Sequence, residues 1–147
     1  MPQDKPRSKP RDTPCTCAML RRTARRLTQA YDQALKASGL RLTQYSLLAN
    51  LTRAGGLSIT ALAARLEMDR TTLTRNLGPL ESAGWIRVLP GADLRSRSVE
   101  ITPAGRRLFE EARPLWQAAE REFRRRMGQD DTQALRRLLD AAVANLR

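Results

Sequence analysis

A short run of basic, hydroxyl and leucine residues, DRTTLTRNLGPLESAGW at positions 69–85, carries the side chains best suited to contact a polyanion. Leu73, Leu77 and Leu80 recur at helical spacing, which predicts a helix that buries one face. The other face, nearest the helix N-terminus, would hold six polar side chains: Arg70, Thr71, Thr72, Thr74, Arg75 and Asn76. Guanidinium groups can hydrogen-bond guanine, threonine methyl groups can contact thymine, and hydroxyls can bind phosphates. The run therefore predicts a helix that enters a DNA groove, and the alternative is an ordinary solvated polar surface.

A basic turn, GADLRSR, follows between two short segments, WIRVLP and SVEI, whose β-branched residues predict a hairpin. Arg95 and Arg97 would lie at its tip, where they could enter the minor groove, whose negative potential attracts arginine. Phosphate would repel a carboxylate at this place, so we expect Asp93 to orient an arginine through a charge-assisted hydrogen bond. The alternative is that the two arginines are solvated turn residues.

The side chains needed for catalysis or metal binding are largely absent. The chain has no histidine, which removes the commonest general base and the commonest metal ligand. Cys15 and Cys17 offer two soft ligands but no histidine to complete a zinc site. The carboxylates form no evident pair and are scattered along the chain, at Asp32, Glu67, Glu81, Asp93 and Glu100 among others. We therefore predict a protein that is not an enzyme and that holds no metal and no cofactor.

Apolar spacing predicts the elements that must position these side chains. A first helix runs from about residue 16 to 38, and Gly39 ends it. Three shorter helices, the hairpin and two further helices follow. Two adjacent short helices and a basic hairpin form the arrangement of a winged helix-turn-helix, so the predicted fold is mainly α with a small β-hairpin wing. The predicted N-caps of the later helices are Thr43, Ser58, Asp69, Thr102, and Asp130 or Asp131.

The bulk composition is that of a basic protein of one domain. The chain has 147 residues, a net charge of +12 and a pI near 11.3, which favours nucleic acid or an acidic membrane surface as partner. No apolar run approaches the roughly 20 residues that span a bilayer, and the first residues lack the apolar segment of a signal peptide. We expect a cytoplasmic protein with no membrane partner. Residues 1–14 contain four prolines and predict a disordered basic arm.

One long segment, SITALAARLEMDRTTLTRNLGPLESAGWIRVLPGADLRSRSVEITPAGRRL, resembles the core of MarR-family transcriptional regulators. The motifs that carry the resemblance are a wing element ending in Asp-x-Arg and a Leu/Ile-Thr-x-x-Gly junction between strand and helix, here Ile101, Thr102 and Gly105. The resemblance extends from about Cys17 to the C-terminus. It implies a homodimeric repressor or activator that binds a pseudo-palindromic operator in double-stranded DNA.

The resemblance also implies how the chain is divided. Residues 15–38 and 103–147 would form dimerisation helices from both termini, and residues 40–102 the winged helix-turn-helix domain. The sequence favours a homodimer independently, because the terminal helices carry more apolar surface than a small winged-helix domain could cover. Two recognition helices would then meet half-sites about 34 Å apart. The alternative is a nonspecific basic nucleic-acid-binding protein that relies on charge alone, although an aromatic content of 4% leaves few platforms for stacking unpaired bases.

A small aromatic or lipophilic effector is the first input signal that the resemblance implies. Family members are often released from DNA by such a ligand, bound between the dimerisation helices and the DNA-binding lobe. The candidate pocket residues are Leu20, Tyr31, Leu42, Tyr45 and Trp116. Each of these could equally be a core or interface residue.

Thiol oxidation is a second possible input. Cys17 lies at a place similar to that of the reactive cysteine in the organic-hydroperoxide-sensing branch of the family. Arg21 and Arg22 follow it at the start of the predicted helix and would favour the reactive thiolate. Leu42 stands where that branch places a second tyrosine, which is a departure from its pattern. Cys17, with Cys15 beside it, is thus a candidate redox sensor, and the alternative is that both are incidental residues at a frayed helix start.

Overall fold

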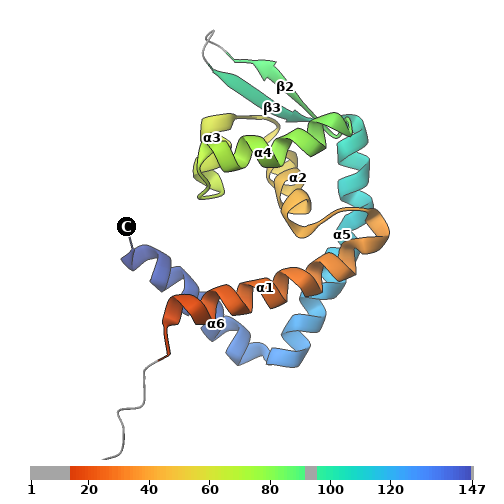
Figure 1. The fold of residues 1–147 in the computed structure, drawn as a ribbon. Coiled ribbons are helices and arrows are strands. Elements are labelled where there is room, and N and C mark those ends of the chain that lie inside the picture. The colour runs from red at the N-terminus through yellow and green to blue at the C-terminus, as the bar shows by residue number, and fades with distance from the viewer. Residues whose placement is uncertain (1–13, 92–95, 147) are drawn as a thin grey trace, which may run out of the picture.

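The computed structural model describes residues 14–91 and 96–146, which fold into six α-helices, one 3-10 helix and three strands (Figure 1). Most of the predicted arm at residues 1–14, together with Asp93 and Arg95, lies outside the described residues. The elements in chain order are α1 (Thr16–Leu35), η1 (Lys36–Ser38), α2 (Leu42–Ala54), β1 (Leu57–Ser58), α3 (Ile59–Arg65), α4 (Arg70–Ser82), β2 (Ile86–Pro90), β3 (Arg97–Ile101), α5 (Pro103–Met127) and α6 (Gln129–Asn145).

The elements form a lobe and a set of terminal helices (Figure 1). Helices α2, α3 and α4 gather beside the sheet, and α5 leads away from this lobe toward α1 and α6. We call the part from α2 to β3, with the start of α5, the winged lobe. No helix among the described residues has the length and apolar character needed to cross a membrane.

The sheet has three antiparallel strands in the order β1-β3-β2, which confirms the predicted hairpin and adds a strand to it. Val99 on β3 pairs with Val88 on β2 and with Leu57 on β1. Sequence analysis missed β1 because two residues are too few to show the alternation that marks a strand.

The core of the lobe comes from one face of each helix. Leu48, Leu62, Leu73 and Leu80 are fully buried, so the leucine spacing that predicted α4 is confirmed. Val99 joins them from the central strand. Burying one such side chain stabilises a fold by about 1.5–3 kcal/mol, which makes this shared core the main force that holds α3, α4 and the sheet together.

Side chains cap three helices as the sequence predicts. Ser58 Oγ accepts a hydrogen bond from the Ala61 N–H at 3.0 Å, and Asp69 Oδ1 accepts one from the Thr72 N–H at 2.8 Å. Thr102 Oγ1 accepts from the Gly105 N–H at 3.1 Å. Each bond satisfies an N–H group that the helix itself leaves without a partner.

The prediction that Thr43 caps α2 is wrong, because Arg41 is the N-cap residue and the helix begins at Leu42, two residues before the start that a Thr43 cap would give. The Asp32 carboxylate, from α1, accepts a hydrogen bond from the Leu42 N–H at 2.7 Å. Gln44 Oε1 accepts another from the Arg41 N–H at 2.9 Å. The start of α2 is therefore fixed partly by a residue ten positions away, which local spacing does not reveal.

The junction between β3 and α5 explains the Ile-Thr-x-x-Gly motif physically. Thr102 donates its hydroxyl hydrogen to the Gly84 carbonyl at 2.7 Å, and its N–H donates to the Trp85 carbonyl at 3.0 Å. Gly105 is buried directly against the backbone of Trp85, where a Cβ atom would overlap the carbonyl oxygen. A glycine is therefore needed for α5 to approach the end of α4 this closely.

Candidate nucleic-acid interface

Helices α3 and α4 form a helix-turn-helix whose turn is held by backbone bonds. The Met68 N–H donates to the Ala63 carbonyl at 2.9 Å, and Glu67 adopts a positive φ of 51° to close the turn. The Asn76 amide lies 3.9 Å from Met68 Sδ and ties α4 back to the turn. These contacts fix where the first turn of α4 lies relative to α3.

The six polar residues predicted to contact DNA all lie on α4, but they differ in how free their side chains are. Arg70, Thr71 and Arg75 are exposed. The Thr72 hydroxyl donates to Asp69 Oδ2 at 2.6 Å, and the Thr74 hydroxyl donates to the Arg70 carbonyl at 2.8 Å. The exposed set available to a ligand is therefore led by the two arginines and Thr71, while Thr72 serves the helix cap.

The cap also sets the charge at the start of α4. The hydrogen bonds from the Thr72 hydroxyl and N–H hold the pKa of Asp69 below its usual value. An ionised carboxylate here accepts the hydrogen bond from the Thr72 N–H and interacts favourably with the positive end of the helix dipole. The carboxylate also places a negative charge next to Arg70, which lowers the net positive charge at this end of α4.

The wing is the hairpin of β2 and β3, which extends beyond α4 in Figure 1. Arg97 is exposed at the start of β3, opposite Pro90 on β2. Farther down the hairpin, Arg87 donates to the Glu100 carboxylate at 2.8 Å. Asp93 and Arg95, also predicted for the wing, lie outside the described residues.

The five predicted effector-pocket residues do not share one site. Tyr45 is buried, and its ring stacks on Phe109 and Trp116 with centroids 5.2 and 5.6 Å apart. Leu42 packs against the same core. Leu20 is 44% exposed on α1 and lies about 16 Å along the helix axis from Tyr31. Of the five, Tyr31 lines an apolar pocket of about 580 Å³ between α1 and α5.

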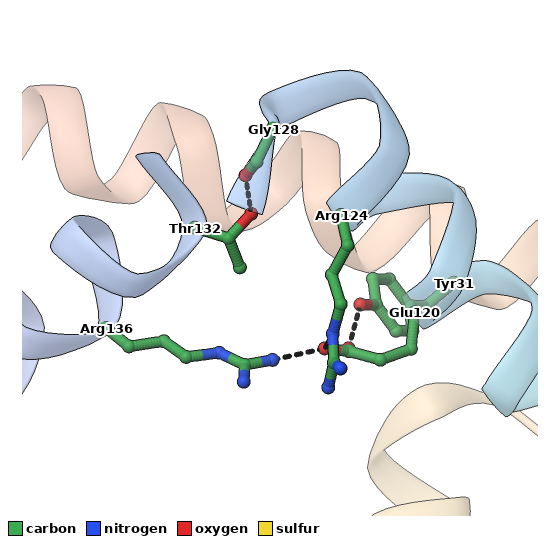
Figure 2. A network of polar contacts seen from close by, with 6 residues as sticks. All are labelled: Tyr31, Glu120, Arg124, Gly128, Thr132 and Arg136. Carbon is green, nitrogen blue, oxygen red and sulfur yellow. Dashed lines mark hydrogen bonds and ion pairs between the residues drawn. The ribbon is translucent and has the colours of Figure 1, made fainter. Parts of the chain in front are cut away.

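Tyr31 also belongs to a polar network that sequence analysis missed (Figure 2). Its hydroxyl donates to Glu120 Oε2 at 2.6 Å, joining α1 to α5. Arg124 donates to Glu120 Oε1 at 3.2 Å, and Arg136 from α6 donates to the same atom. One carboxylate thus links three helices. The spacing of Glu120 and Arg124 was a visible signal, whereas contacts from α1 and α6 depend on the fold.

Electrostatics within the network favour a charged carboxylate and a neutral phenol. Burial raises the pKa of Tyr31 far above its usual value, and the hydrogen bond to Glu120 raises it further. Burial alone would raise the pKa of Glu120, but hydrogen bonds from Tyr31 and Arg124 outweigh it and lower that pKa. The network therefore keeps its charge through the neutral pH range.

Large apolar side chains remain exposed on the terminal helices. They lie near the start of α1, at the end of α5 and along α6. Leu146 is 87% exposed. These residues are Met19, Leu20, Met127, Leu138, Leu139, Val143 and Leu146.

The two cysteines lie at the start of α1, where both are exposed free thiols. Cys15 occupies the N-cap position, and Cys17 lies in the first turn. Within residues 14–91 and 96–146, no group of three Cys, Asp or Glu residues is placed to hold a metal ion.

Comparison with known proteins gives consistent matches. The transcriptional regulator MosR of M. tuberculosis, solved in complex with DNA, is 41% identical to this chain. The match covers 88% of this chain and 97% of MosR, with a TM-score of 0.78. Transcriptional activatory protein BadR of Rhodopseudomonas palustris is 38% identical over 82 residues, or 53% of this chain and 47% of BadR. The regulator PecS of Dickeya dadantii is 31% identical over 90 residues, or 58% of this chain and 54% of PecS.

The chain spans about half the length of these two curated relatives, whereas the match to MosR is nearly complete. The sequence profile of the MarR family matches residues 40–96, which contain α2, β1, α3, α4 and β2, the first strand of the wing. The chain therefore belongs to the MarR family of winged helix-turn-helix transcriptional regulators.

Proposed function

We propose that the protein is a homodimeric, sequence-specific regulator, acting as a repressor at a pseudo-palindromic operator. The observation that carries this proposal is the division of α4 into two faces. Leu73, Leu77 and Leu80 are buried in the lobe, while Arg70 and Arg75 are exposed beside a wing. A helix that is anchored on one side and basic on the other can enter a major groove without disturbing its own core.

Each side chain on the exposed face of α4 has a proposed role. Arg70 and Arg75 are suited to hydrogen-bond guanine, and Thr71 to contact a thymine methyl group or a phosphate. Thr74 and Asn76 flank Arg75 on α4 and would extend the same surface. Arg97, with Asp93 and Arg95, would serve the wing in the minor groove.

The exposed apolar residues of the terminal helices are the observation that supports a homodimer. Among the described residues, seven large apolar side chains on α1, on α5, on α6 and directly after α6 are exposed. A two-fold pairing of these helices would bury them and set two copies of α4 about 34 Å apart, which is one turn of duplex.

Selection from a random duplex pool tests the proposal. We expect the wild-type protein to enrich one pseudo-palindromic sequence, and Arg75→Ala to lower the ratio of specific to nonspecific affinity by about 10–100-fold. Arg107→Ala, an exposed arginine on α5, is the matched control and should leave that ratio unchanged. If no sequence is enriched over bulk DNA, the protein binds nucleic acid through charge alone and the proposal fails.

Release from the operator would depend on a small aromatic or lipophilic effector or on a thiol. The apolar pocket beside Tyr31 offers a site for the effector, with Glu122 and Arg126 among its lining residues. A hydroperoxide could oxidise the Cys17 thiol to a sulfenic acid while it is itself reduced to an alcohol. Loss of operator binding after mild peroxide treatment, with Cys17→Ser resistant and Cys15→Ser as comparison, would support the thiol route. Equal loss in both variants and the wild type would exclude it.

A further inference from the structure

A second basic surface lies at the turn between α5 and α6, on the side of the molecule away from the wing (Figure 1). Side chains from both helices surround a pocket of about 510 Å³ there, which we call the α5–α6 pocket. This volume lies within the range of about 300–1,000 Å³ that small-molecule sites occupy. The lining residues used below are Arg121, Arg124, Arg125, Gln129, Gln133 and Arg136.

The charge of this pocket is one-sided. Four of the lining residues are arginines and none is acidic. Glu120 pairs with Arg124 and Arg136, and Glu122 is shared between Arg125 and Arg126, of which only Arg125 lines the pocket. Two carboxylates therefore stand against four guanidinium groups, which leaves an excess of two positive charges at the pocket.

Arg121 is the arginine whose charge is not balanced locally. It is exposed, and its side chain makes no hydrogen bond or ion pair with another residue in the described ranges. The other three arginines reach their carboxylates through only part of their donors. Each guanidinium has five N–H donors, and Arg124 and Arg136 each use one atom to reach Glu120.

The network in Figure 2 holds two of these arginines in position. Glu120 receives the Tyr31 hydroxyl at 2.6 Å and is 14% exposed, so it is a fixed anchor for Arg124 and Arg136. Thr132, which is buried, donates to the Gly128 carbonyl at 2.7 Å and fixes the first turn of α6. An anchored guanidinium loses less conformational entropy when it binds a ligand than a free one does.

The position of the pocket separates its charge from DNA recognition. In Figure 1 the α5–α6 turn and the wing lie at opposite ends of the molecule. A duplex seated on α4 and the wing would not reach arginines at the far end, because phosphate attraction between exposed charges is screened beyond about 8–10 Å. These arginines therefore suit a different anion.

We propose that the α5–α6 pocket binds a small polyanion, a molecule with at least two phosphate or carboxylate groups. Guanidinium groups recognise both kinds of oxyanion through paired hydrogen bonds. Such a ligand would contact Arg121 and Arg125 from α5 and Gln133 and Arg136 from α6. It would bridge the two helices and hold α6 against α5.

Calorimetric titration of the full chain tests this site, with inorganic pyrophosphate and citrate as the two probes. Buffers are matched in ionic strength with sodium chloride, so that general screening is the same throughout. We expect saturable binding of at least one probe at one site per chain, and Arg121→Gln should weaken it about tenfold, as expected for the loss of one charged contact. The tighter probe identifies phosphate or carboxylate as the preferred group.

Two variants control for the overall basic charge. Arg137→Gln removes an equally exposed arginine next to Arg136 that does not line the pocket, and Arg75→Gln removes one from α4. Both should bind the probe like the wild type. The proposal is overturned if neither probe binds saturably, if Arg137→Gln weakens binding as much as Arg121→Gln does, or if Arg75→Gln is the variant that loses it.

Discussion

The winged lobe buries its core leucines within one chain, whereas the terminal helices leave several of theirs exposed. Leu48 and Leu62 in the lobe are fully buried, but Leu138 in α6 and Leu146 directly after it are 58% and 87% exposed. Both regions are made of leucine-bearing helices, so the difference lies in what packs against them. The lobe has its own core, while the terminal helices carry an exposed apolar surface that the proposed homodimer would cover. Substitutions in the lobe should therefore lower the stability of the single chain, whereas substitutions at the exposed apolar residues should weaken association.

Gly105→Ala should have the largest effect, because it separates α5 from the lobe. A Cβ atom at this position would overlap the Trp85 carbonyl oxygen and lie 2.8 Å from the carbonyl carbon. These are backbone atoms, which cannot rotate aside. We expect a loss of about 3 kcal/mol in the free energy of unfolding, measured by urea denaturation.

Gly78→Ala is the matched control for this substitution. Nothing lies within 4 Å of a Cβ at Gly78, which is in the interior of α4. Alanine should therefore stabilise the protein by about 0.5–1 kcal/mol. Equal effects of the two substitutions would mean that the close approach of α5 to Trp85 does not fix the lobe.

Leu138→Glu should act on association and not on the lobe. The side chain is largely exposed in the single chain, so a charge there costs little until a second copy covers it. A buried unpaired charge would then raise the dissociation constant of the homodimer by about 100-fold. Sedimentation equilibrium measures this, and circular dichroism should show the helices unchanged.

Ala104→Glu provides the comparison, since it adds the same charge at an exposed position in the first turn of α5. It should associate like the wild type. If Leu138→Glu also associates normally, the apolar residues of α6 are not part of a dimer interface, and the contrast between lobe and terminal helices has another cause.

Local patterns predicted the lobe well because its elements are marked by local signals. Leucine spacing located α4, and Ser58, Asp69 and Thr102 marked helix starts that the structure confirms. The prediction for Thr43 failed because Asp32, a residue of another helix, helps to fix where α2 begins. The prediction that Asp130 or Asp131 caps the last helix also failed, because α6 begins at Gln129 after Gly128 and both aspartates lie in its first turn. Membership of a family of transcriptional regulators also agrees with the prediction, made from the absence of histidine, that the chain is not an enzyme.

The candidate sites were predictable only where a single helix carries them. The six polar residues of α4 could be found from one periodic segment, although the bond between Thr72 and Asp69 depends on geometry. The network around Glu120 joins residues 89 positions apart, Tyr31 and Glu120, together with Arg136. Such contacts follow from how α1, α5 and α6 cross, and no local pattern records that.

Glu120→Gln should have an intermediate effect, confined to the terminal helices. The carboxylate accepts from one phenol and two guanidinium groups, and hydrogen bonds to charged groups contribute about 1.5–3 kcal/mol each before the cost of burial is subtracted. We expect a net loss of about 1–2 kcal/mol in the free energy of unfolding. The Tyr31→Phe variant, which keeps both arginine contacts, should lose less.

The effect of Glu120→Gln should depend on pH in a defined direction. The folded pKa of Glu120 is lowered from its ordinary value of 4.5, so its stabilising contribution is present above that value and is lost as the pH falls through the folded pKa. Wild type and Glu120→Gln should therefore differ most near pH 7, and the difference should begin to shrink as the pH falls below about 4.5. A difference that stays constant down to pH 3 would show that the carboxylate charge is not what stabilises the junction.

The smallest effect should come from the helix starts, where the two regions also differ. In the lobe, Ser58 Oγ caps α3 through the Ala61 N–H, whereas Cys15 at the start of α1 makes no side-chain cap bond within the described residues. Ser58→Ala should lower the free energy of unfolding by about 1 kcal/mol, and Cys15→Ala should leave it unchanged in thermal denaturation under reducing conditions. If both substitutions lower the free energy of unfolding equally, the start of α1 is as well fixed as that of α3. The exposed leucines would then belong to a surface that is ordered without a partner, and the contrast between the two regions would be lost.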